Sequence, residues 1–399
     1  MGTEREVVNE WARPTVSQFG LGTKESANPP LGRSFSRFEI QIGPPSHRHD
    51  VIAMEASNAG FAPGLALSIH TRSNSFRPAP TSRYNHPVSS TTPTLVARHA
   101  MATRFEIVLH GGDPSALRAA GEEALDEIDR LEAQLSLYRP GSEVARLNAQ
   151  AHARPVRVTP GLFRLIERAR ELSSATQGTF DITIAPLVRC WGFMGGTGSM
   201  PDEAAVMEAR ALVGMHLLEL DTARLTVRFT RPGVMLDFGS IGKGYAVDRA
   251  AELLREAGVT NALLHGGTST AYALGHGPDG AGWKIAVTSP TNESTERPVT
   301  VVELADESLS VSAVWGRAFQ ADGKSYGHII DPRTGRPAEH ARLSAVVLPG
   351  ATETDALSTA LLTAPELMPL LLRQRPKMRC LVVTGGEQAA QIVTHGLAG

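Results

Sequence analysis

Apolar residues recur at helical spacing in several parts of the chain. The longest stripe advances in steps of three and four residues, and its members are Leu117, Ala120, Ala124, Ile128, Leu131 and Leu135. Asp113 and Pro114 precede this stripe, in the order typical of a capped helix start. The pattern therefore predicts an amphipathic helix that begins near residue 114.

Other stretches carry the same periodicity with their own start and stop signals. Thr159 and Pro160 open a helix that ends near Gly178, and Ser142 can cap a short helix with Val144 and Leu147 on its apolar face. Further helices are predicted over residues 203–213, 354–363 and 366–373.

Short apolar runs bounded by glycine and polar turns predict strands between these helices. They fall near residues 105–109, 156–158, 218–220, 225–229, 261–265, 285–288, 299–304, 309–312, 325–330, 343–348 and 379–383. The strands cluster along the sequence, and the helices interrupt them irregularly. This order favours an α+β fold over a regular βαβ array.

Residues 1–93 lack such periodicity. Proline interrupts this stretch repeatedly, with Ser, Asn, Arg and Gly between, and no apolar pattern survives over the length of a helix. We therefore expect a disordered, low-complexity extension over residues 1–93 and one folded domain over residues 94–399. No apolar run approaches the ~20 residues of a membrane span, and no secretory h-region is visible, so we expect a cytoplasmic protein.

The composition excludes several classes of function. The hydrophobic content of 42% supports a sizeable core, and a formal charge of -2 lacks the basic excess of a nucleic-acid-binding protein. Cys190 and Cys380 are the only cysteines and lie far apart in the sequence. A disulfide framework and a cysteine-based zinc site are therefore excluded.

The stretch 234–258 carries the first candidate chemistry. Apolar residues alternate over residues 234–238 as in a strand, glycines follow, and a helical stripe then runs to Gly258. A strand, a glycine turn and a helix N-terminus form a seat for phosphate, to which Asp237, Ser240 and Lys243 add a carboxylate, a hydroxyl and a cation. An ordinary strand-to-helix turn with a solvated lysine has the same spacing, so both interpretations stay open. A Walker A loop is excluded, because Lys243 is followed by glycine.

A second candidate lies on the predicted helix 354–363. Asp355, Ser358 and Thr359 are three and four residues apart and therefore share one helical face. A carboxylate with hydroxyls is an oxygen-only set of the kind that Mg²⁺ takes, with water or substrate phosphate completing the shell. Polar residues in the first turn of any capped helix look the same, so the pattern alone does not decide.

Two further segments place polar groups beside turns. His328 ends a predicted strand next to Asp331, where a histidine acts as a general base or a ligand contact. The alternative is a partly buried histidine bonded to backbone, with Asp331 serving the turn. Phe180 and Asp181 offer an apolar face and a polar edge to a ligand, or they belong to a core strand with a satisfied carboxylate.

Taken together, these segments resemble the FAD:protein FMN transferases, the ApbE-type flavin transferases. The matching stretches follow the family's order over roughly residues 98–395; they are Met101–Thr103, Leu135–Tyr138, Gly178–Thr183, Trp191–Phe193, Leu236–Asp248, Gly266–Gly267, His328–Gly335 and Asp355–Thr359. Each motif is weak alone, but eight in order are hard to reach by chance. The resemblance implies an ApbE-like α+β fold of mixed or antiparallel sheets with packed helices.

The resemblance also implies a reaction and a site. The family binds FAD, cleaves its pyrophosphate with Mg²⁺, and transfers FMN to a Thr or Ser hydroxyl of an acceptor protein, often a redox-complex subunit, with release of AMP. By motif match, FAD contacts are expected at Met101, Tyr138, Thr179, Phe180, Asp181, Asp237, Lys243, His328 and Ile329. The metal is expected at Ser240, Asp355, Ser358 and Thr359. Catalysis falls to His328 as base, to Lys243, which with Mg²⁺ neutralises charge on the pyrophosphate, and to Asp355, which holds the metal.

Two departures from the family pattern bear on substrate fit. Thr268 stands where the family often has Asp after two glycines, and Ala313 stands where it often has Gly after Thr-Ser. Two other functions stay open beside transfer: hydrolysis of FAD to FMN and AMP with water as acceptor, and binding of FAD without catalysis.

Overall fold

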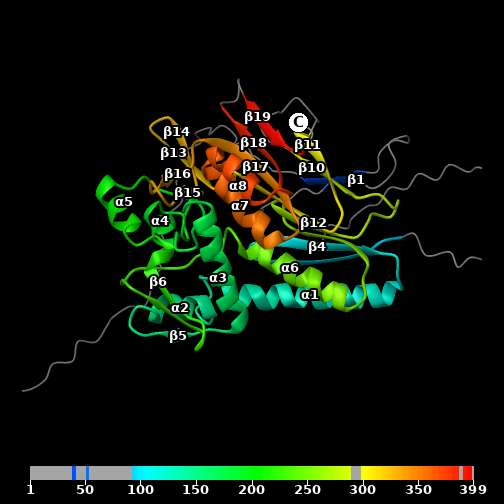
Figure 1. The fold of residues 1–399 in the computed structure, drawn as a ribbon, viewed down its shortest axis with the longest axis horizontal. Helices are drawn as coiled ribbons and strands as arrows, with labels where there is room; N and C mark the ends of the chain where they lie inside the picture. The colour runs from blue at the N-terminus through cyan, green and yellow to red at the C-terminus, as the bar shows by residue number, and fades with distance from the viewer. Residues whose placement is uncertain (1–37, 42–50, 54–91, 289–297, 386–389, 398–399) are drawn as a thin grey trace, which may run out of the picture. The chain divides into compact units, whose positions relative to one another are not determined.

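An eight-stranded antiparallel sheet organises the molecule (Figure 1). The computed structural model describes residues 38–41, 51–53, 92–288, 298–385 and 390–397, all within one compact unit that spans residues 34–399. The helices are α1 Pro114–Leu135, α2 Glu143–Gln150, α3 Pro160–Ala175, α4 Ala185–Cys190, α5 Glu203–Arg210, α6 Gly242–Glu256, α7 Ala351–Thr363 and α8 Met368–Gln374, with 3-10 turns η1 Met215–Leu217 and η2 Pro365–Leu367.

The described strands pair without exception in the antiparallel sense. They are β1 Phe38–Gln41, β2 Val51–Ala53, β3 Thr94–Ala100, β4 Thr103–His110, β5 Val156–Arg157, β6 Leu218–Asp221, β7 Thr226–Phe229, β8 Asn261–Gly266, β9 Thr270–Leu274, β10 Trp283–Val287, β11 Thr300–Leu304, β12 Glu307–Ala313, β13 Ala318–Ala321, β14 Lys324–Gly327, β15 Ile330–Asp331, β16 Arg336–Pro337, β17 Ala341–Leu348, β18 Arg379–Thr384 and β19 Gln391–His395. The predicted α+β class is confirmed.

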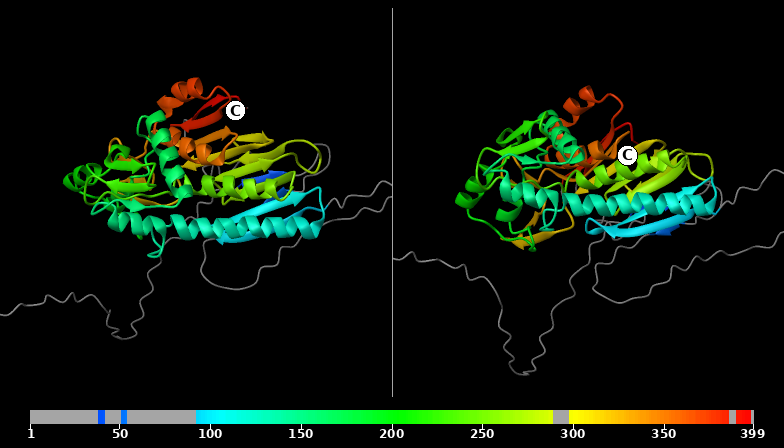
Figure 2. Two further views of the ribbon diagram at one scale, coloured as in Figure 1. Left: turned by 60° about the horizontal axis from the view of Figure 1, so that its bottom comes forward. Right: turned by 90° about the horizontal axis from the view of Figure 1, so that it is seen from below.

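Two layers cover the eight-stranded sheet, whose order is β19-β18-β17-β12-β9-β8-β4-β3. Helices α1, α6 and α7 pack on one face, as Figure 2 shows for α1 beside β3 and β4. The sheet β11-β10-β1-β2 supplies β10 and β11 to the other face, where Trp283, Ile285 and Val302 are buried against Leu263 and Ala271. Helix α7 lies against β12 and β17 and also contacts α3 and α6, which explains why most of its residues are buried.

Several predicted helix starts are confirmed by their caps. The Asp113 carboxylate accepts from the N–H of Ala116 at 2.9 Å, and the Ser142 hydroxyl accepts from Ala145 at 2.8 Å. Gly258, with φ of +79°, directly follows Ala257, the C-cap residue of α6. These caps are local in sequence, which is why the pattern locates them.

The strand predicted over residues 234–238 does not form. Val234, Leu236 and Phe238 are buried as their alternation indicates, but no ladder partner lies beside them among the described residues. Asn148 takes both backbone groups of Leu236 instead, at 2.8 and 3.0 Å, and the N–H of Asp237 donates to the carbonyl of Ile182 at 2.7 Å. A side-chain amide here replaces a neighbouring strand.

The core strand considered for residues 178–186 is absent as well, since turns lead directly into α4. Strands β3, β9, β13, β16 and β19 have no counterpart among the strands that the sequence predicts. Within residues 1–93 the structure describes the short strands β1 and β2, and β1 pairs with β10. The rest of that predicted disordered extension, up to residue 91, lies outside the described residues.

Hydroxyl groups join β12 to α7 inside the core. Ser308, Ser310 and Ser312 alternate along β12 and therefore share one face. Thr354 shares hydrogen bonds with Ser308 at 3.1 Å and Ser310 at 2.8 Å, and Ser358 shares one with Ser312 at 2.9 Å. We call these five residues the hydroxyl seam. Buried hydroxyls that pair in this way avoid the cost of an unsatisfied polar group.

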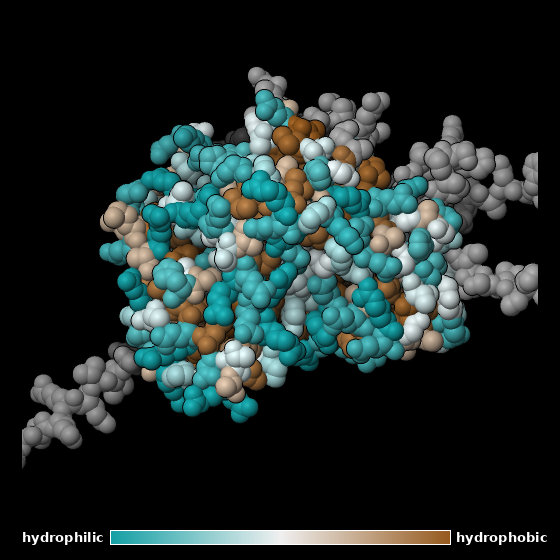
Figure 3. Space-filling view, viewed as in Figure 1, coloured by the Kyte–Doolittle hydropathy of each residue, from teal (hydrophilic) through white to brown (hydrophobic). Residues whose placement is uncertain are grey.

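The surface is largely hydrophilic on the face that Figure 3 shows, with apolar residues in small groups. Ile392 and Val393 on the edge strand β19 are about half exposed, at 47% and 51%. Among the described residues, no helix combines the length and apolar character that crossing a bilayer requires.

Candidate functional site

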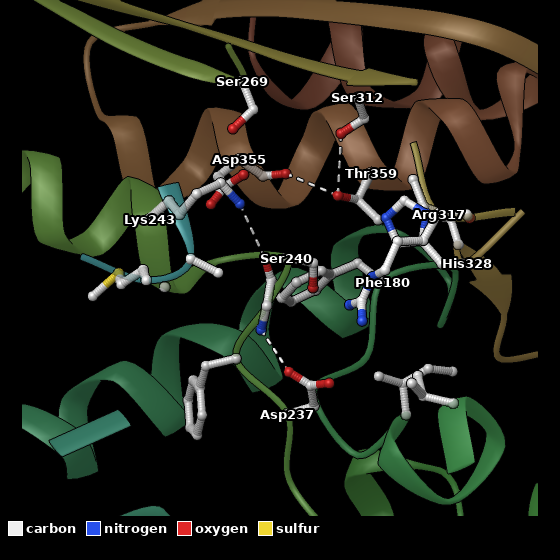
Figure 4. Close-up of a pocket in the computed structure, with 18 of the residues that line it drawn as sticks. Phe180, Asp237, Ser240, Lys243, Ser269, Ser312, Arg317, His328, Asp355 and Thr359 are labelled. Carbon is white, nitrogen blue, oxygen red and sulfur yellow. Dashed lines mark hydrogen bonds between the residues drawn. The ribbon is translucent and has the colours of Figure 1, made fainter. Parts of the chain in front are cut away.

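A cavity of about 580 Å³ collects nearly every predicted site residue. Its walls come from the β3–β4 turn, the ends of α1 and α6, segments 179–193 and 311–332, and α7. The predicted residues that line it are Met101, Tyr138, Thr179, Phe180, Asp181, Asp237, Ser240, Lys243, His328, Ile329, Asp355 and Thr359. Asp237 and Asp355, 118 positions apart in sequence, thus face one cavity (Figure 4).

The Asp355 carboxylate is fixed by the backbone of another helix. The N–H of Gly244, in the first turn of α6, donates to Asp355 Oδ2 at 3.0 Å. The side chain is 4% exposed, and Oδ1 has no hydrogen-bond partner among the residues that the structure describes. One oxygen of the carboxylate is therefore held in place, while the other is free for a ligand in the cavity.

Thr359 and Ser358 differ in where their hydroxyls point. Both donate to the backbone carbonyl of Asp355, at 3.1 and 3.0 Å. Thr359 lines the cavity, whereas Ser358 is fully buried in the hydroxyl seam and does not. Adjacent helix positions point about 100° apart, so only one of the two reaches the cavity. We therefore leave Ser358, which the sequence predicts as a metal ligand, out of the ligand set.

The turn before α6 presents Asp237, Ser240 and Lys243 to the cavity. Asp237 Oδ1 accepts from the N–H of Gly239 at 2.8 Å, and Lys243 Nζ donates to the carbonyl of Gly239 at 3.2 Å. Burial raises the pKa of Asp237, and the charges of Arg317 and Lys243 oppose that rise. The turn therefore offers a carboxylate, a hydroxyl and an ammonium group within one cavity wall.

The predicted phosphate seat at the α6 N-terminus is partly occupied by the protein itself. The N–H of Gly242 donates to the carbonyl of Phe238 at 2.7 Å, and the N–H of Gly244 is taken by Asp355. These two amides are not free to bind phosphate. Positive charge for an anion must then come chiefly from the side chains of Lys243 and Arg317, which both line the cavity.

The contacts of His328 define which of its ring nitrogens carries the proton. Its Nδ1 lies 3.1 Å from the carbonyl oxygen of Arg317, and that oxygen also accepts the His328 backbone N–H at 3.0 Å. Because a carbonyl only accepts, Nδ1 carries the proton and Nε2 is the acceptor of the neutral ring. Burial lowers the pKa of His328. The hydrogen bond to the Arg317 carbonyl opposes this fall, and the charges of Arg317 and Lys243 add to it. A neutral base thus stands in the cavity wall.

The Asp181 carboxylate is bonded to neighbouring protein groups even though the residue lines the cavity. Its Oδ1 accepts from the N–H and hydroxyl of Thr183 at 2.8 and 2.6 Å, and its Oδ2 accepts from the N–H of Met215 at 3.1 Å. Burial raises the pKa of Asp181, while these hydrogen bonds oppose the rise. The alternative of a satisfied carboxylate therefore describes Asp181 best, whereas its neighbour Phe180 is fully buried and contributes an apolar part of the cavity wall.

The cavity rim carries two features from the β3–β4 turn and the end of α1. Met101 and Ala102 adopt left-handed backbone, with φ of +50° and +58°. Tyr138 is 57% exposed, which leaves its ring accessible to a planar ligand.

The sequence interpretation missed Trp315, Arg317, Ser269 and Ser312, which all line the cavity. Arg317 Nη1 donates to the carbonyl of Phe193 at 3.3 Å, and its own carbonyl holds His328. The two departures from the family pattern, Thr268 and Ala313, also line the cavity. No local pattern signals Arg317, because it lies eleven residues before His328 and reaches it only across the β13–β14 hairpin.

The oxygen donors that face the cavity supply part of the coordination shell of a divalent ion. The described residues contain no group of three or more His, Cys, Asp or Glu side chains placed to hold a metal. Asp355 and the hydroxyls of Thr359 and Ser240 do face one cavity as oxygen donors. Mg²⁺ commonly binds through one or two carboxylates and substrate phosphates while keeping several waters. The site therefore suits an ion that arrives with a phosphorylated ligand rather than a closed protein cage.

Comparison with known proteins establishes the family. A model of the ApbE family matches residues 101–382, and the chain belongs to this family. The chain is 29% identical over 307 residues to an FAD:protein FMN transferase of Klebsiella pneumoniae, a match that covers 75% of this chain and 86% of that protein. It is 31% identical over 303 residues to the FAD:protein FMN transferase of Treponema pallidum, covering 72% and 83%. These relatives are transferases, and the chain shares that enzyme class.

A solved structure agrees with this assignment. The crystal structure of the ApbE protein of Thermotoga maritima superposes with a TM-score of 0.69 at 26% identity, covering 76% of this chain and 97% of that one. The likeness extends over the α+β fold described above.

Proposed function

We propose that this protein is an FAD:protein FMN transferase that binds FAD in the cavity and attaches FMN to a Thr or Ser hydroxyl of an acceptor protein. The family and the names of its relatives support the reaction class. The observation that carries the proposal is one cavity that holds a neutral histidine, a lysine and a carboxylate with a free oxygen. Transfer of a phosphoryl group needs a base for the incoming hydroxyl and positive charge for the phosphates.

The reaction forms one bond and breaks one. The acceptor hydroxyl oxygen attacks the FMN-side phosphorus of FAD, and the bond from that phosphorus to the oxygen of the AMP phosphate breaks. His328 Nε2 takes the hydroxyl proton, because Nδ1 already carries one and is bonded to Arg317. AMP leaves with the electron pair of the broken bond. Lys243 and Arg317 offset the negative charge of the phosphates.

Asp355 and Thr359, with Ser240, would hold Mg²⁺ in this proposal. A bound Mg²⁺ would supply charge neutralisation at the pyrophosphate. The protein's own part is to hold Asp355 by the Gly244 N–H and Thr359 by the Asp355 carbonyl, so that both oxygens face the cavity. The exposed Tyr138 ring at the rim is placed to stack on a planar ring system.

The test combines two product measurements. The protein is incubated with FAD, Mg²⁺ and a candidate acceptor protein, and the acceptor is then examined by fluorescence in a denaturing gel and by mass spectrometry while AMP is quantified. Covalent flavin on the acceptor with equimolar AMP supports transfer. AMP and FMN without labelling supports the hydrolase alternative, and bound FAD with neither product supports a binding protein.

A further inference from the structure

Helix α7 begins without a capping side chain of its own. Its N-cap residue is Gly350, which has extended backbone and no side chain to accept from the first-turn N–H groups. The Asp248 carboxylate of α6 accepts these bonds instead. Its Oδ1 accepts from the N–H of Ala351 at 2.7 Å, and its Oδ2 accepts from the N–H and the hydroxyl of Thr352 at 2.7 and 2.5 Å.

The bonds between the two helices are reciprocal. Asp248 lies four residues after Gly244 on α6, and Asp355 lies four residues after Ala351 on α7. Each carboxylate accepts from the backbone N–H near the start of the other helix. We call this four-residue arrangement the α6–α7 clasp. A carboxylate at a helix N-terminus is stabilised by the helix dipole as well as by its hydrogen bonds.

The clasp leaves little freedom between the helices. A Cβ atom on Gly244 would lie 2.2 Å from the carbonyl oxygen of Ala351 and 2.8 Å from Asp355 Cβ. Only glycine permits this approach, and at this distance the Gly244 N–H reaches Asp355 Oδ2. Any shift of the α7 start away from α6 would therefore lengthen the bond that orients the Asp355 carboxylate.

We propose that Asp248, which does not line the cavity, is a positioning residue: it sets where α7 begins on α6 and thereby aims Asp355 at the cavity. The kinetic part of this inference rests on the proposed function, whereas the structural part does not. Loss of Asp248 would free the first turn of α7, and the Asp355–Gly244 bond would open with it.

A helix cap with no wider role is the competing explanation, and a rescue variant separates the two. Asp248→Ala removes the clasp. Gly350→Ser in the same chain restores a local cap, since the backbone at Gly350 is extended and an added Cβ would have space, 3.8 Å from the present Asp248 Oδ2. Positioning predicts that the double variant regains thermal stability but not transfer rate. If Asp248 acts only as a helix cap, both thermal stability and transfer rate should return in the double variant.

The first measurement uses hydrogen exchange of the free protein, which needs no substrate. Asp248→Ala is expected to speed exchange in the first turns of α6 and α7, at residues 242–246 and 351–355, before the rest of the core. The matched control is Asp202→Ala, which removes a carboxylate cap from α5, bonded to Ala205 at 2.7 Å and away from the cavity. It should leave exchange at both segments unchanged.

The second measurement is the steady-state transfer rate at a temperature where all variants are folded. We expect kcat to fall about 10- to 100-fold in Asp248→Ala and in the double variant, as for other residues that orient a ligand-binding side chain, with no fall in Asp202→Ala. Recovery of kcat in the double variant, or unchanged exchange at residues 242–246 in Asp248→Ala, would overturn the proposal. If the wild-type protein lacks transfer activity, the proposed function fails, and the exchange experiment still decides the role of Asp248.

Discussion

His328 Nδ1 donates to the carbonyl oxygen of Arg317, while the Arg317 guanidinium lines the same cavity as the ring. One residue therefore sets both the tautomer and the electrostatic surroundings of the proposed base. The backbone carbonyl fixes the proton on Nδ1, and the side-chain charge disfavours a second proton on Nε2. This separation allows the two effects to be tested independently.

The first prediction concerns the pH dependence of transfer. A base whose pKa is lowered stays neutral to more acidic pH, so kcat/KM should hold as pH falls past 6.5, the ordinary histidine pKa, and decline only below it. Arg317→Gln removes one charge but keeps the backbone carbonyl, so the acid limb should move towards higher pH. The pH–rate profile of both proteins measures this.

The control for that experiment is Arg336→Gln, which removes an exposed arginine that pairs with Glu203 outside the cavity. Its profile should overlay that of the wild type. An acid limb that stays in place in Arg317→Gln would show that the guanidinium does not act on His328.

The second prediction concerns the two carboxylates of α7. Asp355→Ala should lower the transfer rate about 100-fold or more, because it removes the carboxylate that faces the cavity. Glu353→Gln is the matched control, since Glu353 lies on the same helix but pairs with Arg375 at 2.5 Å and with Arg168. Full Mg²⁺-dependent activity in Asp355→Ala would refute the metal assignment.

The third prediction separates the neighbouring hydroxyls of α7. Ser358→Ala should lower the free energy of unfolding by about 1 kcal/mol, because it deletes a buried hydrogen bond of the hydroxyl seam, and should leave kcat within about twofold. Thr359→Val should reduce kcat with a smaller loss of stability, since its hydroxyl faces the cavity. Urea unfolding and transfer assays on both variants measure the two effects. A larger fall in kcat for Ser358→Ala than for Thr359→Val would place the Ser358 hydroxyl in the site.

The fourth prediction concerns the approach of α6 to α7. Gly244→Ala should destabilise the protein by about 1–3 kcal/mol, because the added methyl group meets the carbonyl of Ala351 and the backbones must separate. Gly242→Ala, two residues earlier in the same helix, meets only the Phe238 and Leu135 side chains at 3.6 and 3.9 Å. Thermal unfolding should distinguish them, with near-wild-type stability for Gly242→Ala. Equal stability of the two variants would contradict the close helix contact.

Local signals account for what the sequence predicts well. Asp113, Ser142 and Gly258 mark helix ends through bonds and backbone angles within a few residues, and the structure confirms them. The resemblance of its motifs to a known family predicts the candidate site, and all but one of the predicted residues line the cavity. Spacing alone leaves each motif open between an ordinary structural and a functional interpretation.

Long-range contacts account for the features that the sequence does not predict. The alternation at residues 234–238 predicts a strand, but whether a ladder forms depends on a partner strand, and Asn148 takes that place. Ser358 and Thr359 share a helical face by spacing, and Ser312 of β12 shares a hydrogen bond with each hydroxyl, at 2.9 and 3.3 Å. Only Thr359 also lines the cavity. Arg317 joins the site through a hairpin whose register the sequence does not reveal.

The hydroxyl seam has a consequence for how far α7 can travel along the sheet. Alternate residues of a strand are about 6.6 Å apart, and helix residues four positions apart rise about 6 Å, so the two rows of hydroxyls have nearly the same spacing. Apolar packing alone would tolerate small slips, whereas here a slip would break the paired bonds of Thr354 and Ser358 together. The paired hydroxyls therefore fix the position of α7 along the sheet. The part of the cavity wall that α7 forms is held as rigidly as the sheet itself.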